Sequence, residues 1–112
     1  MAAPMLETAD RIRRILTYDP NMGERKMFGG VCFLLNGNML CGANKDGKLM
    51  LRVGKEQHDA VQQMPHTSLM NFTGRVFTGY AYVEPDGFTS DEQLENWLAI
   101  AIRFVASLPP KG

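Results

Sequence analysis

Apolar residues recur at helical spacing near each end of the chain. The first set predicts a helix over residues 6–16 and consists of Leu6, Ala9, Ile12, Ile15 and Leu16. The second set predicts a helix behind a capping box of Ser90 and Gln93, and consists of Leu94, Trp97, Leu98, Ala101, Phe104, Val105 and Leu108. We expect Trp97 to anchor the core between this terminal helix and a sheet.

Runs rich in Val, Phe and Leu lie between these helices and predict strands. Three runs cover residues 26–35, 38–44 and 48–53, and they are separated by Asn36-Gly37 and Asp46-Gly47. Both residues of such a pair accept the positive φ of a type I′ turn, so successive runs form an antiparallel meander.

The second half of the chain continues with a short helix and a further β region. Residues 55–64 predict a helix whose Ala60, Val61 and Met64 face inward. Residues 76–84 predict a β region, in which Gly79 marks a bulge or a close approach of backbones. The order α-β-β-β-α-β(β)-α predicts an α+β fold in two layers, with helices packed on a mainly antiparallel sheet.

The meander has two apolar faces. One face carries Val31, Phe33, Leu35, Leu40, Leu49, Leu51 and Val53, and the other, the second face, carries Cys32, Leu34, Met39, Cys41, Met50 and Arg52. A half-exposed antiparallel sheet alternates apolar with polar residues, and this one does not. Either helices cover both faces, or Leu34, Met39, Met50 and Arg52 form an interface or a ligand face. Arg52 either packs its stem and keeps its charge in water, or contacts an anion.

The same register places Cys32 opposite Cys41 in a non-hydrogen-bonded pair, where side chains approach most closely. Three interpretations stay open at this stage. The first is two small buried thiols, which is how free cysteine usually behaves. The second is a redox pair. The third is metal binding with His58 or His66, although C-x8-C is not a zinc spacing.

Other residue types offer little chemistry. We place Gly29-Gly30 inside the first strand, where the pair predicts a bulge rather than a phosphate-binding loop. His58 and His66 lie outside any catalytic motif. We therefore expect no catalytic residue, no cofactor and no metal.

Charge and hydropathy exclude two classes of partner. Twelve basic side chains balance twelve acidic ones, which leaves no surplus to neutralise phosphates. We interpret Arg11, Arg13 and Arg14 as a solvated helix face and expect no direct binding to nucleic acid. No apolar run approaches the roughly 18 residues of a membrane span, and no signal peptide is recognisable. Two cysteines without a secretion signal indicate the cytoplasm.

Five segments in order, together with Phe33 and the Asn36-Gly37 turn, resemble the N-terminal domain of the TfoX/Sxy family. They are residues 26–30 (KMFGG), 49–54 (LMLRVG), 70–74 (MNFTG), 79–83 (GYAYV) and 94–98 (LENWL). The resemblance covers roughly residues 11–111, and we expect residues 1–112 to form one such domain without the family's C-terminal domain. It implies an α/β sandwich similar to type III secretion chaperones, which often dimerise.

The resemblance also implies a role. Two-domain members regulate the genes of natural transformation in bacteria, so we expect a non-enzymatic regulatory or interaction domain. We expect it to act as a homodimer and through an unidentified protein partner. The alternative is a small-molecule or anion-binding domain that uses the second face near Arg52.

Overall fold

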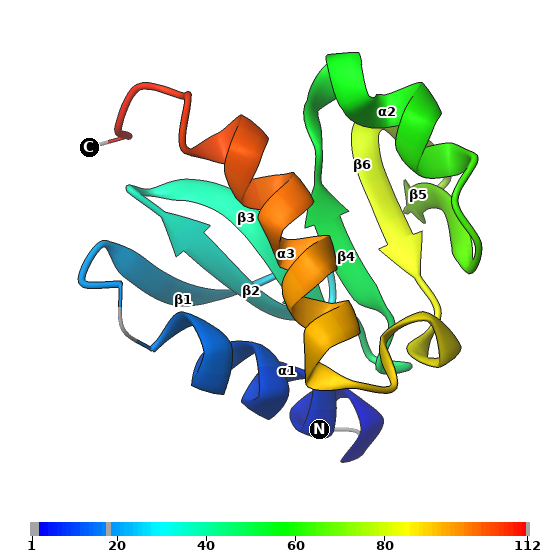
Figure 1. Ribbon diagram of the computed structural model, residues 1–112, viewed down its shortest axis with the longest axis horizontal. Coiled ribbons are helices and arrows are strands. Elements are labelled where there is room, and N and C mark those ends of the chain that lie inside the picture. Colours follow the sequence, from blue (N-terminus) through cyan, green and yellow to red (C-terminus); the bar gives the residue numbers. More distant parts are fainter. Residues whose placement is uncertain (1–2, 18, 112) are drawn as a thin grey trace.

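Three helices pack on one antiparallel sheet in the computed structural model, which describes residues 3–17 and 19–111. Over these residues the helices are α1 (Ala3–Leu16), α2 (Gly54–Gln62) and α3 (Asp91–Val105), with a short 3-10 helix η1 (Pro85–Phe88). The strands are β1 (Met22–Met27), β2 (Gly30–Leu35), β3 (Asn38–Ala43), β4 (Leu49–Arg52), β5 (Thr67–Phe72) and β6 (Arg75–Val83). The sheet order is β1-β2-β3-β4-β6-β5, and Figure 1 shows α1 and α3 in front of it. The predicted α+β class is confirmed.

Two-residue turns join three of the strand pairs. The predicted Asn36-Gly37 turn is confirmed, with φ of 53° and 83°. Phe28-Gly29 makes the same turn, with φ of 55° and 72°, and splits the predicted run of residues 26–35 into β1 and β2. The prediction of a bulge at Gly29-Gly30 was therefore wrong. The sequence did not predict this turn, because a bulky side chain such as that of Phe28 rarely adopts positive φ.

The neighbouring Gly30 is required for close packing between strands. A Cβ at this position would lie 2.1 Å from the carbonyl oxygen of Ala43 on β3. Gly79 in β6 packs against the start of α2, because a Cβ at this position would lie 3.3 Å from the carbonyl carbon of Gly54. The Gly79 carbonyl accepts from the Val53 amide at 2.7 Å, and its amide donates to Nδ1 of His58 at 3.0 Å. The predicted close approach of backbones at Gly79 is confirmed.

The helices agree with their predicted periodicity with two exceptions: Leu6 of α1 is 44% exposed, and α2 differs from its prediction. The capping box of α3 is present, since the Ser90 hydroxyl accepts from the Gln93 amide at 3.1 Å and the Gln93 side chain accepts from the Ser90 amide at 3.0 Å. In and beyond α2, Val61 is buried as predicted, but Ala60 and Met64 are exposed. The helix ends at Gln62, two residues before the expected end, so Met64 leaves the helical face.

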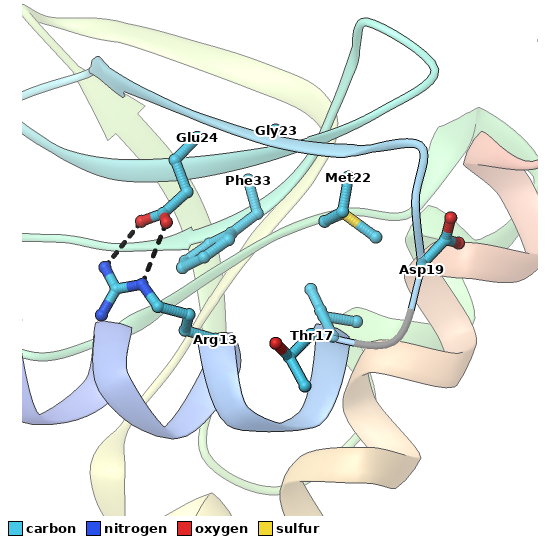
Figure 2. Close-up of a pocket in the computed structure, with 8 residues that line it drawn as sticks. Arg13, Thr17, Asp19, Met22, Gly23, Glu24 and Phe33 are labelled. Carbon is cyan, nitrogen blue, oxygen red and sulfur yellow. Dashed lines mark hydrogen bonds and ion pairs between the residues drawn. The ribbon is translucent and has the colours of Figure 1, made fainter.

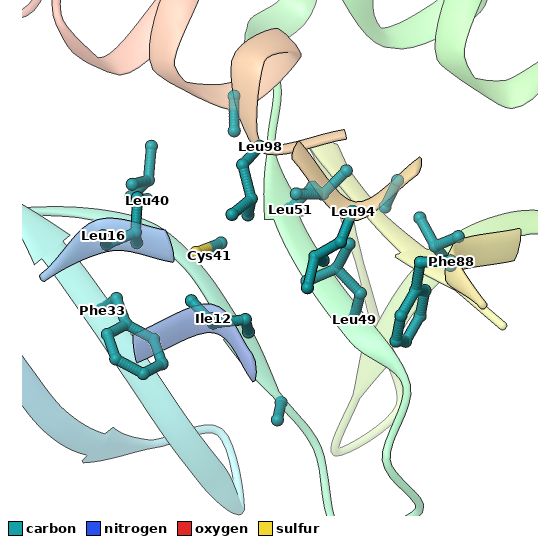
Figure 3. Close-up of a cluster of buried hydrophobic side chains, with 14 of the residues drawn as sticks. Ile12, Leu16, Phe33, Leu40, Cys41, Leu49, Leu51, Phe88, Leu94 and Leu98 are labelled. Atoms are coloured by element: carbon teal, nitrogen blue, oxygen red, sulfur yellow. The ribbon is translucent and has the colours of Figure 1, made fainter. Parts of the chain in front are cut away.

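The main core lies between the first face of the sheet and the helices α1 and α3. Figure 3 shows the side chains that meet there, which include Ile12, Leu16, Phe33, Leu40, Cys41, Leu49, Leu51, Phe88, Leu94 and Leu98. Each of these residues is buried, and they come from both helices, from η1 and from β2, β3 and β4. This single layer of helices on one face leaves the other face to be covered in a different way.

The second face is covered by the ends of the sheet itself. Phe28, in the turn between β1 and β2, meets Phe72 and Phe77 of β5 and β6 with ring centroids 5.7 Å apart in each pair. The two edges of the sheet thus bend toward each other across the second face. A second cluster is enclosed beneath them, formed by Cys32, Met39, Met50 and Met70 with Met27, Phe77, Tyr80 and Tyr82 around it. The sequence left two alternatives for this face, a covering helix or an open contact surface. The structure agrees with neither of them.

Candidate functional site

A β-bulge separates the two cysteines. Leu34 pairs with Met39, but Phe33 pairs with Cys41, so Leu40 is an extra residue in β3. Cys32 therefore faces Gly42 and belongs to the second cluster, whereas Cys41 turns into the main core. The predicted pairing of Cys32 with Cys41 was wrong, because the bulge reverses the alternation of β3 beyond Leu40.

The environment of each thiol disfavours redox chemistry. Burial raises the pKa of Cys32 to about 11. Burial also raises the pKa of Cys41, and the nearby Cys32 adds to the effect. A thiol reacts as its thiolate, so both groups are unreactive near neutral pH. Both cysteines are free. The first of the three interpretations, two buried thiols, agrees with this structure.

The predicted second-face residues divide between the second cluster and a cavity. Leu34, Met39 and Met50 are 6%, 6% and 0% exposed, so this face is not an open surface for a second copy. Leu34, Met39 and Arg52 line a cavity of about 220 Å³, whereas Met50 lies in the cluster and away from the cavity wall. We call this space the second-face cavity. Its full lining is Arg25, Met27, Phe28, Leu34, Gly37, Asn38, Met39, Arg52, Tyr80 and Lys111.

Three cationic side chains line the second-face cavity: Arg25, Arg52 and Lys111. No carboxylate is part of its wall among the residues described, and none of the three cations forms an ion pair with the described acidic side chains. Arg52 lies opposite Tyr80 in the sheet, and its guanidinium carbon is 5.8 Å from the Tyr80 ring centroid and 5.6 Å from that of Phe104. The cavity is therefore electropositive, and two aromatic rings stabilise the charge of Arg52.

The three cations come from distant parts of the chain. Arg25 is on β1, which bends over the second face. Lys111 is held by the turn between β2 and β3, because its amide donates to the Asn36 carbonyl at 2.8 Å. In addition, the Asn38 side chain donates to the Pro109 carbonyl at 2.9 Å. The sequence predicted Arg52 from its alternation with Met50, but Lys111 carried no periodic signal at all.

Gly37 allows the terminal segment to pack against that turn. A Cβ at Gly37 would lie 2.2 Å from the Lys111 carbonyl oxygen, whereas a Cβ at Gly74, which also has positive φ, would meet nothing within 4 Å. We expect Gly74→Ala to lower the free energy of unfolding by about 1–2 kcal/mol, the cost of left-handed backbone. Gly37→Ala should cost more and also release residues 109–111.

Urea unfolding of both variants measures that difference, and ¹⁵N relaxation of Lys111 reports its release. Equal free energies of unfolding, with Lys111 still rigid in Gly37→Ala, would contradict the packing described here.

A second cavity, of about 280 Å³, lies between the end of α1 and β1 (Figure 2). Arg13 donates to both carboxylate oxygens of Glu24, at 2.9 and 2.6 Å, and this pair lies at one end of the cavity. The hydrogen bonds from Arg13 hold the pKa of Glu24 below its usual range. Arg13 also bonds Asp10. Arg13 is thus already paired with carboxylates of the protein, and among the residues described this cavity offers an anionic ligand no free cation.

An apolar groove lies between the segment after α2 and the helix α3. Its volume is about 470 Å³, and its lining residues are Met64, Pro65, His66, Gly87, Gln93, Asn96, Trp97 and Ile100. We call it the Trp97 groove. The Trp97 ring packs against the main core and donates from Nε1 to the Gly87 carbonyl at 2.9 Å, but it is only half-buried. The prediction that Trp97 anchors the core is confirmed only in part.

The histidines have structural positions. His58 accepts the Gly79 amide, as described above, and His66 lines the Trp97 groove. Over residues 3–17 and 19–111, no three His, Cys, Asp or Glu side chains gather in a way that would hold a metal ion. None of the helices in that part of the chain is long and apolar enough to cross a membrane.

One comparison with known proteins identifies the family. The model of the TfoX N-terminal domain matches residues 16–105, which is most of the chain. No curated protein and no solved structure matches this chain. The similarity to type III secretion chaperones thus stays a prediction. The matched family is one of regulatory domains and is not a known enzyme family. The chain therefore belongs to the TfoX N-terminal domain family.

Proposed function

We propose that this domain is a non-enzymatic regulatory module that binds a protein partner in the Trp97 groove. The observation that carries the proposal is an apolar groove whose lining contains no Asp, Glu, Lys or Arg, with a half-buried tryptophan in its wall. Tryptophan is enriched among the few residues that dominate binding energy in protein interfaces. Met64 adds an adaptable apolar contact at the rim, because it is 37% exposed.

The surroundings of the groove favour a partner segment with an apolar centre and basic flanks. Asp86 and Glu92 adjoin the lining residues Gly87 and Gln93, and both carboxylates are exposed. Neither forms an ion pair with the side chains described. Charges of one sign around an apolar patch select a partner of the opposite sign and speed its association.

A photo-crosslinking amino acid in place of Asn96 tests the proposal in the native cell. Asn96 lines the groove, and the same amino acid in place of Thr73, in the turn between β5 and β6, serves as the matched control. We expect one discrete crosslinked protein from the Asn96 position and none from Thr73. The purified partner should bind Trp97→Ala about thirtyfold more weakly, since a hot-spot truncation costs about 2 kcal/mol or more.

Two results would contradict the proposal. The first is equal capture of the same protein from both positions, which would show non-specific contact. The second is unchanged affinity of the purified partner for a folded Trp97→Ala variant. The homodimer stays a separate prediction, and sedimentation velocity of the wild-type protein measures it directly.

A further inference from the structure

We propose that the second-face cavity binds a small organic carboxylate with an apolar body. This cavity shares no lining residue with the Trp97 groove, so the two sites are distinct and this one does not depend on the partner proposed above. The proposal rests on the unpaired donors of Arg52, on the convergence of two further cations and on the apolar wall.

Arg52 presents a hydrogen-bonding group that none of the residues described in the structure uses. Its guanidinium lies near the rings of Tyr80 and Phe104, which fix its position. No hydrogen bond among the described residues uses its donors, in contrast to Arg13, whose donors bind Glu24 and Asp10. A planar guanidinium held in place and left without an acceptor is suited to two parallel bonds with a carboxylate.

Three cationic side chains line the same cavity, and simple packing of Arg52 would not explain why the other two lie there. An arginine that only covers apolar surface keeps its head in water and needs no other cation beside it. Here Arg25 from β1 and Lys111 from the terminal segment line the same cavity as Arg52. Like charges brought together repel each other, and a bound anion removes that repulsion.

The other residues that line the cavity determine what kind of group can accompany the carboxylate in the ligand. Apolar and aromatic side chains make up about half of the lining, namely Met27, Phe28, Leu34, Met39 and Tyr80. A volume of about 220 Å³ is below the roughly 300–1,000 Å³ of pockets for drug-sized molecules, so the ligand is small. A carboxylate suits this wall better than a phosphate dianion, because transfer of the higher charge from water to apolar surroundings costs more.

The experiment is a ¹H–¹⁵N NMR titration of the whole chain with benzoate, benzamide and inorganic phosphate. Benzoate carries both the charge and the apolar body, benzamide lacks the charge, and phosphate lacks the body. We expect benzoate to shift signals of Arg52, Tyr80 and Lys111, and to bind about tenfold or more tightly than either other probe.

Variants assign the effect to the cavity. Arg52→Gln should weaken benzoate binding by about tenfold to a hundredfold, the range for loss of a charge-assisted hydrogen bond. Arg75→Gln is the matched control, since Arg75 also lies over an aromatic ring of the same sheet, 5.8 Å from the Phe77 centroid, but outside the cavity. It should bind benzoate like the wild type. Lys111→Gln, at an exposed position, provides the same test if Arg52→Gln fails to fold.

Several results would overturn the proposal. Absence of binding by all three probes would show that the cavity is not a ligand site. Benzamide binding as tightly as benzoate would show that the charge has no role, and phosphate binding as tightly would remove the assignment to a carboxylate. Equal losses in Arg52→Gln and Arg75→Gln would place the ligand elsewhere.

Discussion

Met50→Asp is expected to leave no folded protein. Met50 is 0% exposed within the second cluster, which the edges of the sheet enclose. The substitution removes a buried apolar side chain, at about 2–5 kcal/mol, and places a carboxyl group without a partner in its position, at several kcal/mol more. The sum is comparable to the whole stability of a domain of this size, roughly 5–15 kcal/mol.

The matched control is Val76→Asp, at a position in β6 that is 54% exposed. It should lower the free energy of unfolding by about 1 kcal/mol or less. Circular dichroism with urea unfolding distinguishes the two variants. A Met50→Asp protein that remains folded and becomes monomeric would show instead that the second face is an interface between subunits, as the alternation of residues alone suggested.

Phe88→Ala should destabilise the domain by about 3–5 kcal/mol, the cost of truncating a fully buried aromatic side chain. Phe88 is 1% exposed and packs in the main core beneath α3 (Figure 3). Trp97→Ala should cost distinctly less, because Trp97 is only half-buried and its ring also lines the groove. The larger side chain should therefore have the smaller effect.

Urea unfolding followed by circular dichroism measures both variants on the same scale. Fluorescence is unsuitable, since Trp97 is the one tryptophan of the chain. If Trp97→Ala were as costly as Phe88→Ala, the tryptophan would be a core residue and the groove a lesser feature of the surface.

Local chemistry explains which elements could be predicted. The Asn36-Gly37 turn and the capping box of Ser90 and Gln93 depend on residues within a few positions of each other, and the structure has both. The Phe28-Gly29 turn was missed, because Phe at positive φ is unusual and is stabilised here by its contacts with Phe72 and Phe77. No strand was predicted over residues 67–72, where the structure has β5, since just one of its residues, Met70, is buried and no alternation appears.

The candidate sites show the same division. Alternation along β2, β3 and β4 placed Leu34, Met39 and Arg52 on one face, and all three line the second-face cavity. The same alternation misplaced Cys41, because a bulge has no signature in the flanking residues of β3. The helical spacing predicted that Trp97 faces the core. It could not show that the segment after α2 leaves one side of the ring open to the groove.

The sequence by itself determined the helices, the antiparallel pairing of β2, β3 and β4 and the family, because these depend on short-range periodicity, turn chemistry and ordered motifs. Only the tertiary structure decided what covers the second face and which charges meet there. The sheet bends so that Phe28 reaches β5 and β6, and the terminal segment brings Lys111 to the cavity. Those contacts join residues tens of positions apart, and burial of apolar surface, which has no direction along the chain, selects them.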